Sequence, residues 1–227
     1  DITVIHNGIS PRSWRVPAAT VRATHEQYNP GGGPMLLFFG RLEWEKGVQD
    51  LIAALARVRR SHPGTRLVVA GKGRHAQELV KDARKARVLR SVDFVGHLSD
   101  RELVAALAAA DVVVLPSKYE PFGIVALEAA AAGAPLVAST AGGLGEVVVH
   151  DETGLSFTPG DVEGLASAVR AVLDDPASAR RRARAAKARL TTDFDWSHIA
   201  AATVSVYQSA RVISRGPLGR PKIATGN

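Results

Sequence analysis

Short apolar runs alternate with longer segments of helical periodicity along the chain from residue 35 onward. The runs are rich in valine and leucine and apolar at nearly every position, which is typical of parallel strands covered on both faces. Strands are therefore predicted at 35–39, 66–70, 92–95, 112–115, 135–138 and 154–157, and helices at 47–61, 74–89, 99–109, 123–132, 143–149, 161–174, 177–190 and 196–212.

This alternation predicts an α/β fold in which a strand and a helix repeat about six times. Crossovers between parallel strands are almost always right-handed, so we expect a doubly wound, parallel, six-stranded Rossmann-like sheet with helices on both faces. Helix-start signals agree with this pattern. Ser99 is followed by Glu102, Asp161 precedes a helical segment, and Asp175 stands before Pro176.

The regular pattern covers residues 35–190, which we expect to form one domain. Residues 1–34 begin with a short apolar strand and continue with prolines and consecutive glycines, so they are predicted to be an interdomain strand and linker. Residues 191–212 are predicted to contain a C-terminal helix, and residues 213–227 a flexible tail. Because the chain starts on Asp1 without a methionine, we expect it to be part of a longer protein.

Positive charge is concentrated near the carboxyl end of the chain. The formal net charge is +7, and much of it comes from arginines and a lysine in residues 180–189. A solvated helix face is the simplest interpretation, and contact of this basic helix with an anionic membrane surface is the alternative. Aromatic residues are sparse there, which argues against nucleic acid as a partner.

Composition also bears on where the protein works. The longest apolar runs are far shorter than the roughly 20 residues of a membrane span, and the first residues do not form a cleavable leader. The absence of cysteine excludes a disulfide framework. We therefore expect a cytoplasmic protein, either free or peripheral at the inner membrane face.

Two carboxylates, Glu120 and Glu128, surround a Pro/Gly turn that connects the strand at 112–115 to an apolar helix. This turn lies at the carboxyl end of a parallel strand, where open α/β sheets bind ligands. Glu128 stands in an otherwise apolar run, so burial would be costly unless a hydroxyl-rich ligand or a cation satisfied it. The alternative is that both acids are solvated.

Two cations, Arg41 and Lys46, follow the first strand and precede a helix that begins near Gly47. Cations beside a helix N-terminus form an anion site, because charge and backbone N–H groups converge there. The alternative is a basic surface loop with Lys46 paired to Glu43 or Glu45. A glycosidase would use two carboxylates without needing these cations, so the cations favour a phosphate leaving group.

Three further turns are candidate ligand contacts. The segment from Gly71 through Gly73 to residue 76 satisfies the dinucleotide pattern G-x-G-x-x-A, with Asp93 as its acid, but Asp93 starts a strand instead of ending one. We favour a tight turn close to a nucleotide over a nicotinamide site. His97 is expected to be either a solvated residue or part of the wall of a pocket for a nucleotide base. The turn at 142–143 suits either phosphate or close packing.

These residues together resemble a known family. The segments that carry the resemblance are residues 4–9, Gly40-Arg41-Leu42 with Lys46-Gly47, Glu120-Pro121-Phe122-Gly123 with Glu128, and Gly142-Gly143 with Glu146. They look like the C-terminal, donor-nucleotide-binding domain of a retaining GT-B glycosyltransferase of family 4, the glycosyl transferases group 1. The resemblance covers nearly everything from residue 1 to about residue 210, and its motifs are specific in combination.

The resemblance implies a role for each matching residue. Arg41 and Lys46 match the positions that bind the donor diphosphate and stabilise the leaving charge, and Glu120 matches the acid on the donor sugar, so these three are the expected catalytic residues. Glu128 matches the acid on the ribose hydroxyls. Neither a metal nor a cofactor is expected. The remaining expected donor contacts are Gly40, Gly71, Gly73, His97, Leu98, Phe122, Gly123, Ile124, Gly142 and Gly143.

The resemblance also implies that half of the enzyme is missing. Residues 35–190 would be the nucleotide-sugar-binding domain, and the helix at 196–212 would pack on an absent N-terminal domain that holds a saccharide or lipid-linked acceptor. The expected activity is transfer of a hexose-type sugar from a nucleotide-diphosphate sugar. The alternatives are a noncatalytic module that binds nucleotide sugars and, less favoured, an NAD-binding dehydrogenase domain.

Overall fold

The computed structural model describes residues 3–10 and 14–214, with side chains to residue 209. In this part of the chain, six parallel strands form one sheet in the order β3-β2-β1-β4-β5-β6, which confirms the predicted doubly wound topology. The strands are β1 (Met35–Phe39), β2 (Arg66–Ala70), β3 (Val92–Gly96), β4 (Val112–Leu115), β5 (Leu136–Ser139) and β6 (Leu155–Phe157).

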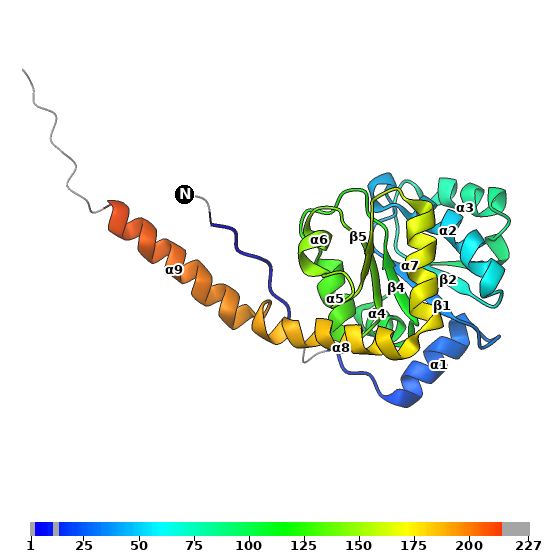
Figure 1. Cartoon of the computed structure of the whole chain (residues 1–227), viewed down its shortest axis with the longest axis horizontal. Helices are drawn as coiled ribbons and strands as arrows, with labels where there is room; N and C mark the ends of the chain where they lie inside the picture. The colour runs from blue at the N-terminus through cyan, green and yellow to red at the C-terminus, as the bar shows by residue number, and fades with distance from the viewer. Residues whose placement is uncertain (1–2, 11–13, 215–227) are drawn as a thin grey trace, which may run out of the picture.

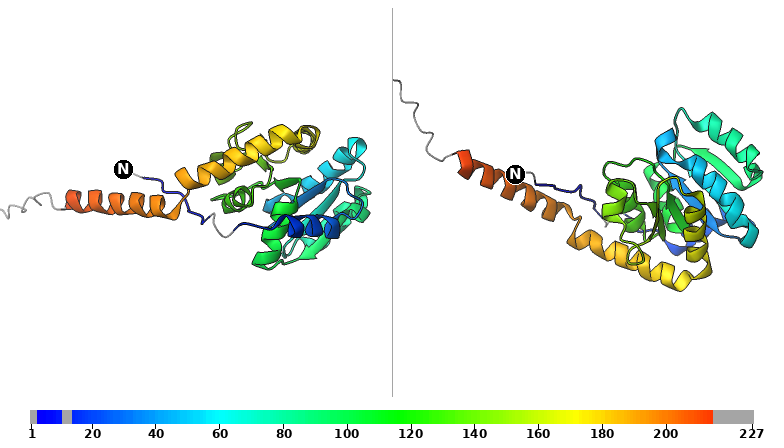
Figure 2. Two further views of the ribbon diagram at one scale, coloured as in Figure 1. Left: turned by 90° about the horizontal axis from the view of Figure 1, so that it is seen from below. Right: turned by 45° about the horizontal axis from the view of Figure 1, so that its top comes forward.

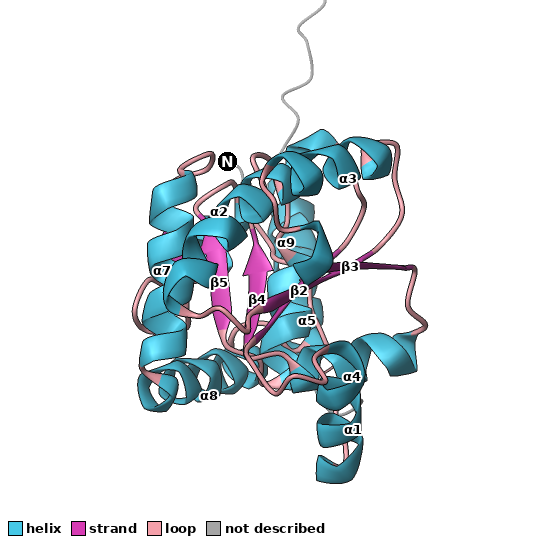
Figure 3. Cartoon of the chain, turned by 90° about the vertical axis from the view of Figure 1, so that its right-hand side faces the viewer, coloured by secondary structure: helices cyan, strands magenta, loops and turns pink. Residues whose placement is uncertain are grey.

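Helices cover both faces of the sheet (Figure 1). One layer contains α2 (Val48–Ser61), α3 (Ala76–Lys85) and α7 (Val162–Asp174). The other contains α4 (Asp100–Ala109), α5 (Ile124–Ala132) and α6 (Gly143–Val147). Two short 3-10 turns are η2 (Trp44–Lys46) and η3 (Leu89–Ser91), and α8 (Pro176–Thr192) and α9 (Trp196–Ser214) close the chain. In Figure 3, β4 and β5 lie between α7 and α5.

The position of β1 in the sheet explains why its sequence is apolar throughout. All five of its residues are buried, with Leu36 and Phe38 in the core beneath α2 and α7, and Leu37 and Phe39 in the core beneath α4 and α5. Successive side chains of a strand point to opposite faces, so a strand covered on both sides needs apolar residues at every position. The sheet therefore separates two hydrophobic cores.

One predicted linker segment is helical instead. This helix is α1 (Ala18–Tyr28), and Pro17 is its N-cap residue. None of its residues is fully buried, so its sequence lacks a strong apolar stripe, and the surrounding prolines and glycines favoured a loop. Val21 and Tyr28 pack partly against the core on the α4 side, and these tertiary contacts stabilise the helix.

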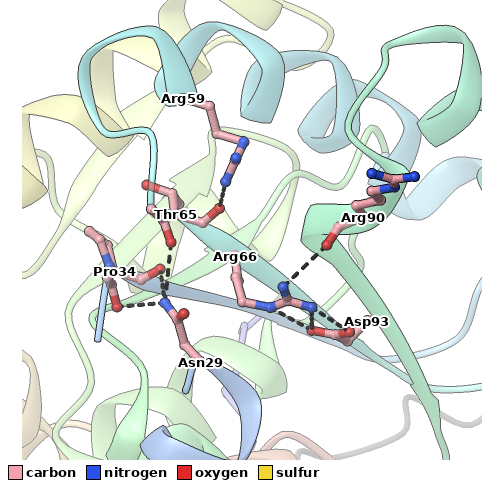
Figure 4. Close-up of polar contacts among 9 residues, drawn as sticks. Asn29, Pro34, Arg59, Thr65, Arg66, Arg90 and Asp93 are labelled. Atoms are coloured by element: carbon pink, nitrogen blue, oxygen red, sulfur yellow. Dashed lines mark hydrogen bonds and ion pairs between the residues drawn. The ribbon is translucent and has the colours of Figure 1, made fainter. Parts of the chain in front are cut away.

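The segment after α1 is fixed to the amino-terminal edge of the sheet by Asn29 (Figure 4). This side chain is 2% exposed, and its Nδ2 donates to the carbonyl oxygens of Gly33, Pro34 and Gly64 at 2.6, 3.1 and 3.3 Å. A buried amide is stabilising when its hydrogen bonds are satisfied. Asn29 thus positions the entry to β1 relative to the loop before β2.

The N-terminal segment and α9 project together from the domain (Figures 1 and 2). The predicted first strand is extended but joins no sheet; its end, Ile9, forms one parallel bridge with Asp195 and donates its N–H to Phe194 O at 2.8 Å. Helix α9 exposes large apolar side chains, including Trp196, Val204 and Tyr207. Of the tail predicted at 213–227, residues 213–214 belong to α9 instead, and residues 215–227 lie outside the described residues. In the part of the chain that is described, no helix is long and apolar enough to cross a membrane.

Candidate active site

The centre of the sheet is the point where the chain changes direction. β1 and β4 are neighbours, but β1 leads on to β2 on one side and β4 to β5 on the other. Their following loops separate at the carboxyl edge and leave a crevice, which is where doubly wound folds bind ligands. The predicted residues Arg41, Lys46 and Glu120 all lie on these two loops.

Lys46 and Glu120 form an ion pair across this crevice. Lys46 Nζ lies 2.7 Å from Glu120 Oε2, and the side chains are only 14% and 10% exposed. The alternative pairing of Lys46 with Glu43 or Glu45 is therefore wrong in this structure. A pair this shielded from water needs good geometry to offset its desolvation, and a 2.7 Å contact provides it.

Arg41 occupies the same loop but behaves differently. Its side chain is 72% exposed, and Nη2 lies 3.8 Å from Glu45 Oε1, which is a weak contact. The guanidinium is therefore available to an incoming anion at little cost. Lys46 supplies a paired, shielded charge inside the crevice, and Arg41 an exposed one at its rim.

A glycine allows the two loops to approach each other. Gly47 adopts φ +71° between η2 and α2, and a β-carbon at this position would overlap the carbonyl group of Pro116, just after β4. The loops are joined next to it, because Lys118 N donates to Glu45 O at 2.7 Å. Only glycine combines this backbone conformation with such close contact.

The crevice is a small cavity of about 240 Å³ lined by Arg41, Lys46, Glu120 and Phe122 together with apolar residues of β1 and β4. Ile124, at the first turn of α5, also lines it, so the positive end of that helix and Lys46 border the same cavity. Helix N-terminus and cation act in the same direction on a bound anion.

A second cavity of about 330 Å³ continues from the first one. Both are lined by Phe39, Gly40 and Arg41, and the second one extends to the turns after β2 and β3. Its other lining residues include Gly71, Lys72, His97, Leu98 and Leu103. Of these, Lys72 and Leu103 were not predicted. Lys72 is a variable position of the glycine pattern at 71–76, and no short motif marks Leu103. The two cavities form one groove along the carboxyl edge, with its charge at the β1–β4 end.

Glu128 lies outside this groove. It faces a neighbouring cavity of about 530 Å³ shared with Trp14, Arg15 and Asp100. Among the described residues, Leu103 lines both this cavity and the groove. Burial, with a smaller contribution from the negative charge of Asp100, raises the pKa of Glu128 above its usual range. The structure thus brings Arg41, Lys46 and Glu120 together but places Glu128 one cavity away.

The raised pKa of Glu128 predicts that Glu128→Gln makes the protein more stable at neutral pH. The folded state disfavours the ionised carboxyl, so the free energy of unfolding falls as pH rises through the raised pKa, and glutamine avoids this loss. Thermal unfolding should show a higher midpoint for the variant at about pH 7 and no difference at about pH 4, below the ordinary pKa. Glu26→Gln, on an exposed position of α1, is the control and should change neither midpoint. A lower midpoint for Glu128→Gln at both pH values would contradict this account.

The glycine pattern at residues 71–76 is a packing turn. A β-carbon on Gly71 or Gly73 would overlap the carbonyl of Gly40 or Leu42, and Leu42 N donates to Lys72 O at 2.9 Å. These glycines hold the β2 turn against the loop that carries Arg41. Gly71 also lines the groove, in agreement with a tight turn beside a ligand.

Asp93 cannot serve as the ribose acid of a dinucleotide site at this turn. Arg66, on β2, donates hydrogen bonds from Nε and Nη2 to the Asp93 carboxylate at 2.7 to 3.0 Å (Figure 4). Both residues lie near the start of their strands, β2 and β3. The two residues therefore lie toward the amino-terminal edge of the sheet, away from the groove. This geometry counts against the dehydrogenase alternative.

The second glycine turn, Gly142–Gly143, supports the Glu120 turn. Gly143 N donates to Glu120 O at 2.9 Å, and a β-carbon on Gly143 would meet the backbone of Phe122. Gly123, which precedes α5, has φ +74° and lies against Gly143. Packing is thus an observed role of these glycines, and contact with a ligand through Phe122, Gly123, Ile124 or Gly142 stays a prediction.

The basic segment at 180–189 is only partly a solvated face. Arg182 is buried and pairs with Asp151 at 3.1 Å, and Arg189 pairs with Asp193 at 2.8 Å. Arg180, Arg181 and Arg184 are exposed. Membrane contact through these three stays a prediction. Within the described residues, no three histidine or acidic side chains gather as ligands for a metal ion.

Comparison with known proteins agrees with this geometry. Residues 22–189 match the family model of the glycosyl transferases group 1. The chain is 58% identical over 221 residues to a glycogen synthase of Mycobacterium tuberculosis, an alignment that covers 97% of this chain and 51% of that protein. The chain spans about half the length of the curated relatives it matches.

Solved structures give the same result. Anabaena HepE in complex with UDP-glucose superposes with a TM-score of 0.83 at 28% identity, covering 91% of this chain and 57% of HepE. A sucrose-phosphate synthase from Thermosynechococcus elongatus superposes with a TM-score of 0.77 at 34% identity, covering 92% and 52%. The Rossmann-like sheet expected of a GT-B glycosyltransferase is confirmed. With its sheet order, its crevice pair and its match over residues 22–189, the chain belongs to the glycosyl transferases group 1.

Proposed function

We propose that this chain is the donor-binding part of a retaining glycosyltransferase that moves a hexose-type sugar from a nucleotide-diphosphate sugar to an acceptor. The observation that carries the proposal is the Lys46–Glu120 pair, held in the crevice between β1 and β4 at 2.7 Å and largely shielded from water. It places a cation and a carboxylate within one small cavity, as needed to bind a diphosphate beside a sugar.

Each group has a distinct task in this proposal. Lys46, Arg41 and the N-terminus of α5 bind the diphosphate and stabilise the charge that develops as it leaves, so the bond from the sugar to phosphate can break without a metal ion. Glu120 accepts hydrogen bonds from sugar hydroxyls and stays paired with Lys46. The cationic side of the site supplies the leaving-group chemistry, and the carboxylate positions the sugar.

The rest of the groove suits the nucleoside. Gly71, His97 and Leu98 line the cavity next to Arg41, which gives space for a base and ribose. Glu128 reaches ribose hydroxyls if the neighbouring cavity opens toward the groove at Leu103. A hydroxyl that donates to Glu128 would favour its ionised form and lower its pKa toward the ordinary range.

The relatives favour a hexose donor. HepE has been solved with UDP and with UDP-glucose, and the mycobacterial relative is named as a glycogen synthase. The chain spans about half of those proteins, so we place the acceptor site, for a saccharide or a lipid-linked acceptor, in a part of the enzyme outside these residues. We further propose that the enzyme works in the cytoplasm or at the inner membrane face, where the exposed arginines of α8 could contact anionic lipid.

A noncatalytic module that binds nucleotide sugars is the second candidate. Such a module would use the same Lys46–Glu120 crevice to bind its ligand. The two candidates share the binding step and differ in whether transfer follows. Joining this chain to the remaining half of the protein and assaying sugar transfer separates them.

The isolated 227-residue chain is predicted to bind at least one of UDP, ADP and GDP in titration calorimetry, with a dissociation constant of about 1 mM or lower. EDTA should leave the affinity unchanged. Arg41→Ala should weaken the bound diphosphate about tenfold and its nucleoside hardly at all, since a charge-assisted contact contributes about 1.5 to 3 kcal/mol. Binding of NADH with none of the three diphosphates would refute the proposal and favour the dehydrogenase.

A further inference from the structure

Exposed aromatic residues lie close in sequence to Lys46 and Glu120. Trp44 is 59% exposed and stands two positions before Lys46, and Tyr119 is 66% exposed and immediately precedes Glu120. A single exposed aromatic residue on a protein surface needs no explanation. Here the loop after β1 carries Trp44, and the loop after β4 carries Tyr119 together with Phe122, which lines the crevice.

The loops that carry these rings are tied to each other. Lys118 N and Tyr119 N both donate to Glu45 O, at 2.7 and 3.4 Å. Glu45 is the neighbour of Trp44, so these bonds bring the two aromatic positions together across the loops. The arrangement depends on the same approach of β1 and β4 loops that creates the Lys46–Glu120 pair.

The indole ring of Trp44 is held in place despite its exposure. Lys118 Nζ lies 5.1 Å from the ring centroid, and the same ammonium pairs with Asp50 Oδ2 at 2.7 Å. Lys118 and Asp50 are 24% and 15% exposed, so this ion pair is largely shielded from water. A cation fixed over one face of an indole orients the ring and leaves its remaining surface for another partner.

We propose that Trp44 and Tyr119 form a platform, here called the rim platform, on which sugar rings of an oligosaccharide acceptor stack. Pyranose rings have C–H groups on one face, and a flat, pre-oriented aromatic ring covers them with little further loss of conformational freedom. The proposal rests on the proposed function and adds a contact on this chain to the acceptor site placed outside it, because an acceptor must bring a hydroxyl to the sugar held at Glu120, the residue next to Tyr119. An α-glucan chain is the occupant, in keeping with the glycogen synthase among the relatives.

Maltoheptaose is the probe, added to the 227-residue chain labelled for NMR at its tryptophan indoles. The chain has three tryptophans, and the indole signal of Trp44 is expected to shift while those of Trp14 and Trp196 stay in place. Trp44→Ala should lower the affinity for maltoheptaose about tenfold, and Tyr119→Ala by a smaller factor. Trp196→Ala removes a similarly exposed indole on α9, 52% against 59% for Trp44, and should leave the affinity unchanged.

Lys118→Met tests the positioning of the ring. It keeps the indole but removes the cation, so maltoheptaose affinity should fall less than in Trp44→Ala, and Trp44→Phe should recover part of the loss. The unfolding midpoints of Trp44→Ala and Tyr119→Ala should stay close to that of the unsubstituted chain, because both side chains are exposed.

Nucleotide binding separates this proposal from the proposed function. Trp44→Ala should bind the preferred nucleoside diphosphate as tightly as the unsubstituted chain does. Maltoheptaose binding that requires Trp44, in a chain that binds no nucleotide, would support the rim platform as a saccharide site and refute the proposed function. If maltoheptaose does not bind, or binds equally well to Trp44→Ala, the rim platform is refuted. A Trp44 signal that moves only when the remaining half of the protein is added would show that it is a domain contact.

Discussion

Lys46→Met is expected to lower the affinity of the chain for its nucleoside diphosphate about ten- to a hundredfold while the affinity for the corresponding nucleoside barely changes. Lys46 is the cation fixed inside the crevice, 2.7 Å from Glu120, so its loss removes a charge-assisted contact to phosphate and nothing from the base. Titration calorimetry with the diphosphate and the nucleoside measures both affinities. Equal losses for the two ligands would show that Lys46 has no specific contact with phosphate.

The same change has a second effect that needs a control. Removing Lys46 leaves Glu120 as an unpaired carboxylate that is only 10% exposed, which destabilises the fold by about 3 kcal/mol. The double variant Lys46→Met with Glu120→Gln removes both charges and should recover most of the stability but none of the diphosphate affinity. Recovery of the affinity in the double variant would mean that the single change acts through misfolding.

Gly47→Ala is expected to destabilise the protein by roughly 3 kcal/mol, because it adds both backbone strain and a steric clash. Gly47 has φ +71°, and an added β-carbon would overlap the Pro116 carbonyl. The clash would push the loop after β1 away from the loop after β4, so the affinity for diphosphate should fall as well. Urea unfolding and calorimetry measure the two effects.

Gly96→Ala is the matched control for this change. Gly96 has the same φ of +71°, but an added β-carbon there has no neighbour within 4 Å, so the variant carries strain without the clash. Its expected cost is about 1 kcal/mol, with diphosphate affinity unchanged. Equal destabilisation by the two alanines would assign the whole effect at Gly47 to its backbone conformation and would remove the argument for a steric fit between the loops.

The sheet was predictable from sequence because its strands are covered on both faces. A strand such as β1 must be apolar at every position, and this local pattern marks it without knowledge of its neighbours. The caps at Ser99, Asp161 and Asp175 were predictable for the same reason, since each bonds to a backbone N–H three residues away. Helix α1 was missed because its stability depends on packing against α4 and not on a local apolar stripe.

The sequence predicted which residues form the site but not how their side chains are arranged. Arg41, Lys46 and Glu120 follow strand ends, so the topology of a doubly wound sheet places them at one edge. The sequence could not show which acid pairs with Lys46, because Glu43 and Glu45 are closer to it in sequence than Glu120 is. The approach of the loops at Gly47 decides it.

The sequence by itself determined the strands, the helix caps and the edge of the sheet at which the chemistry lies, because these depend on the period of apolar residues and on contacts within a few residues. Only the tertiary structure decided that Lys46 pairs with Glu120, 74 residues away, that Glu128 lies in a separate cavity, and that Lys118 orients Trp44. Such pairings depend on how closely two loops approach in space. A sequence contains no direct record of those distances.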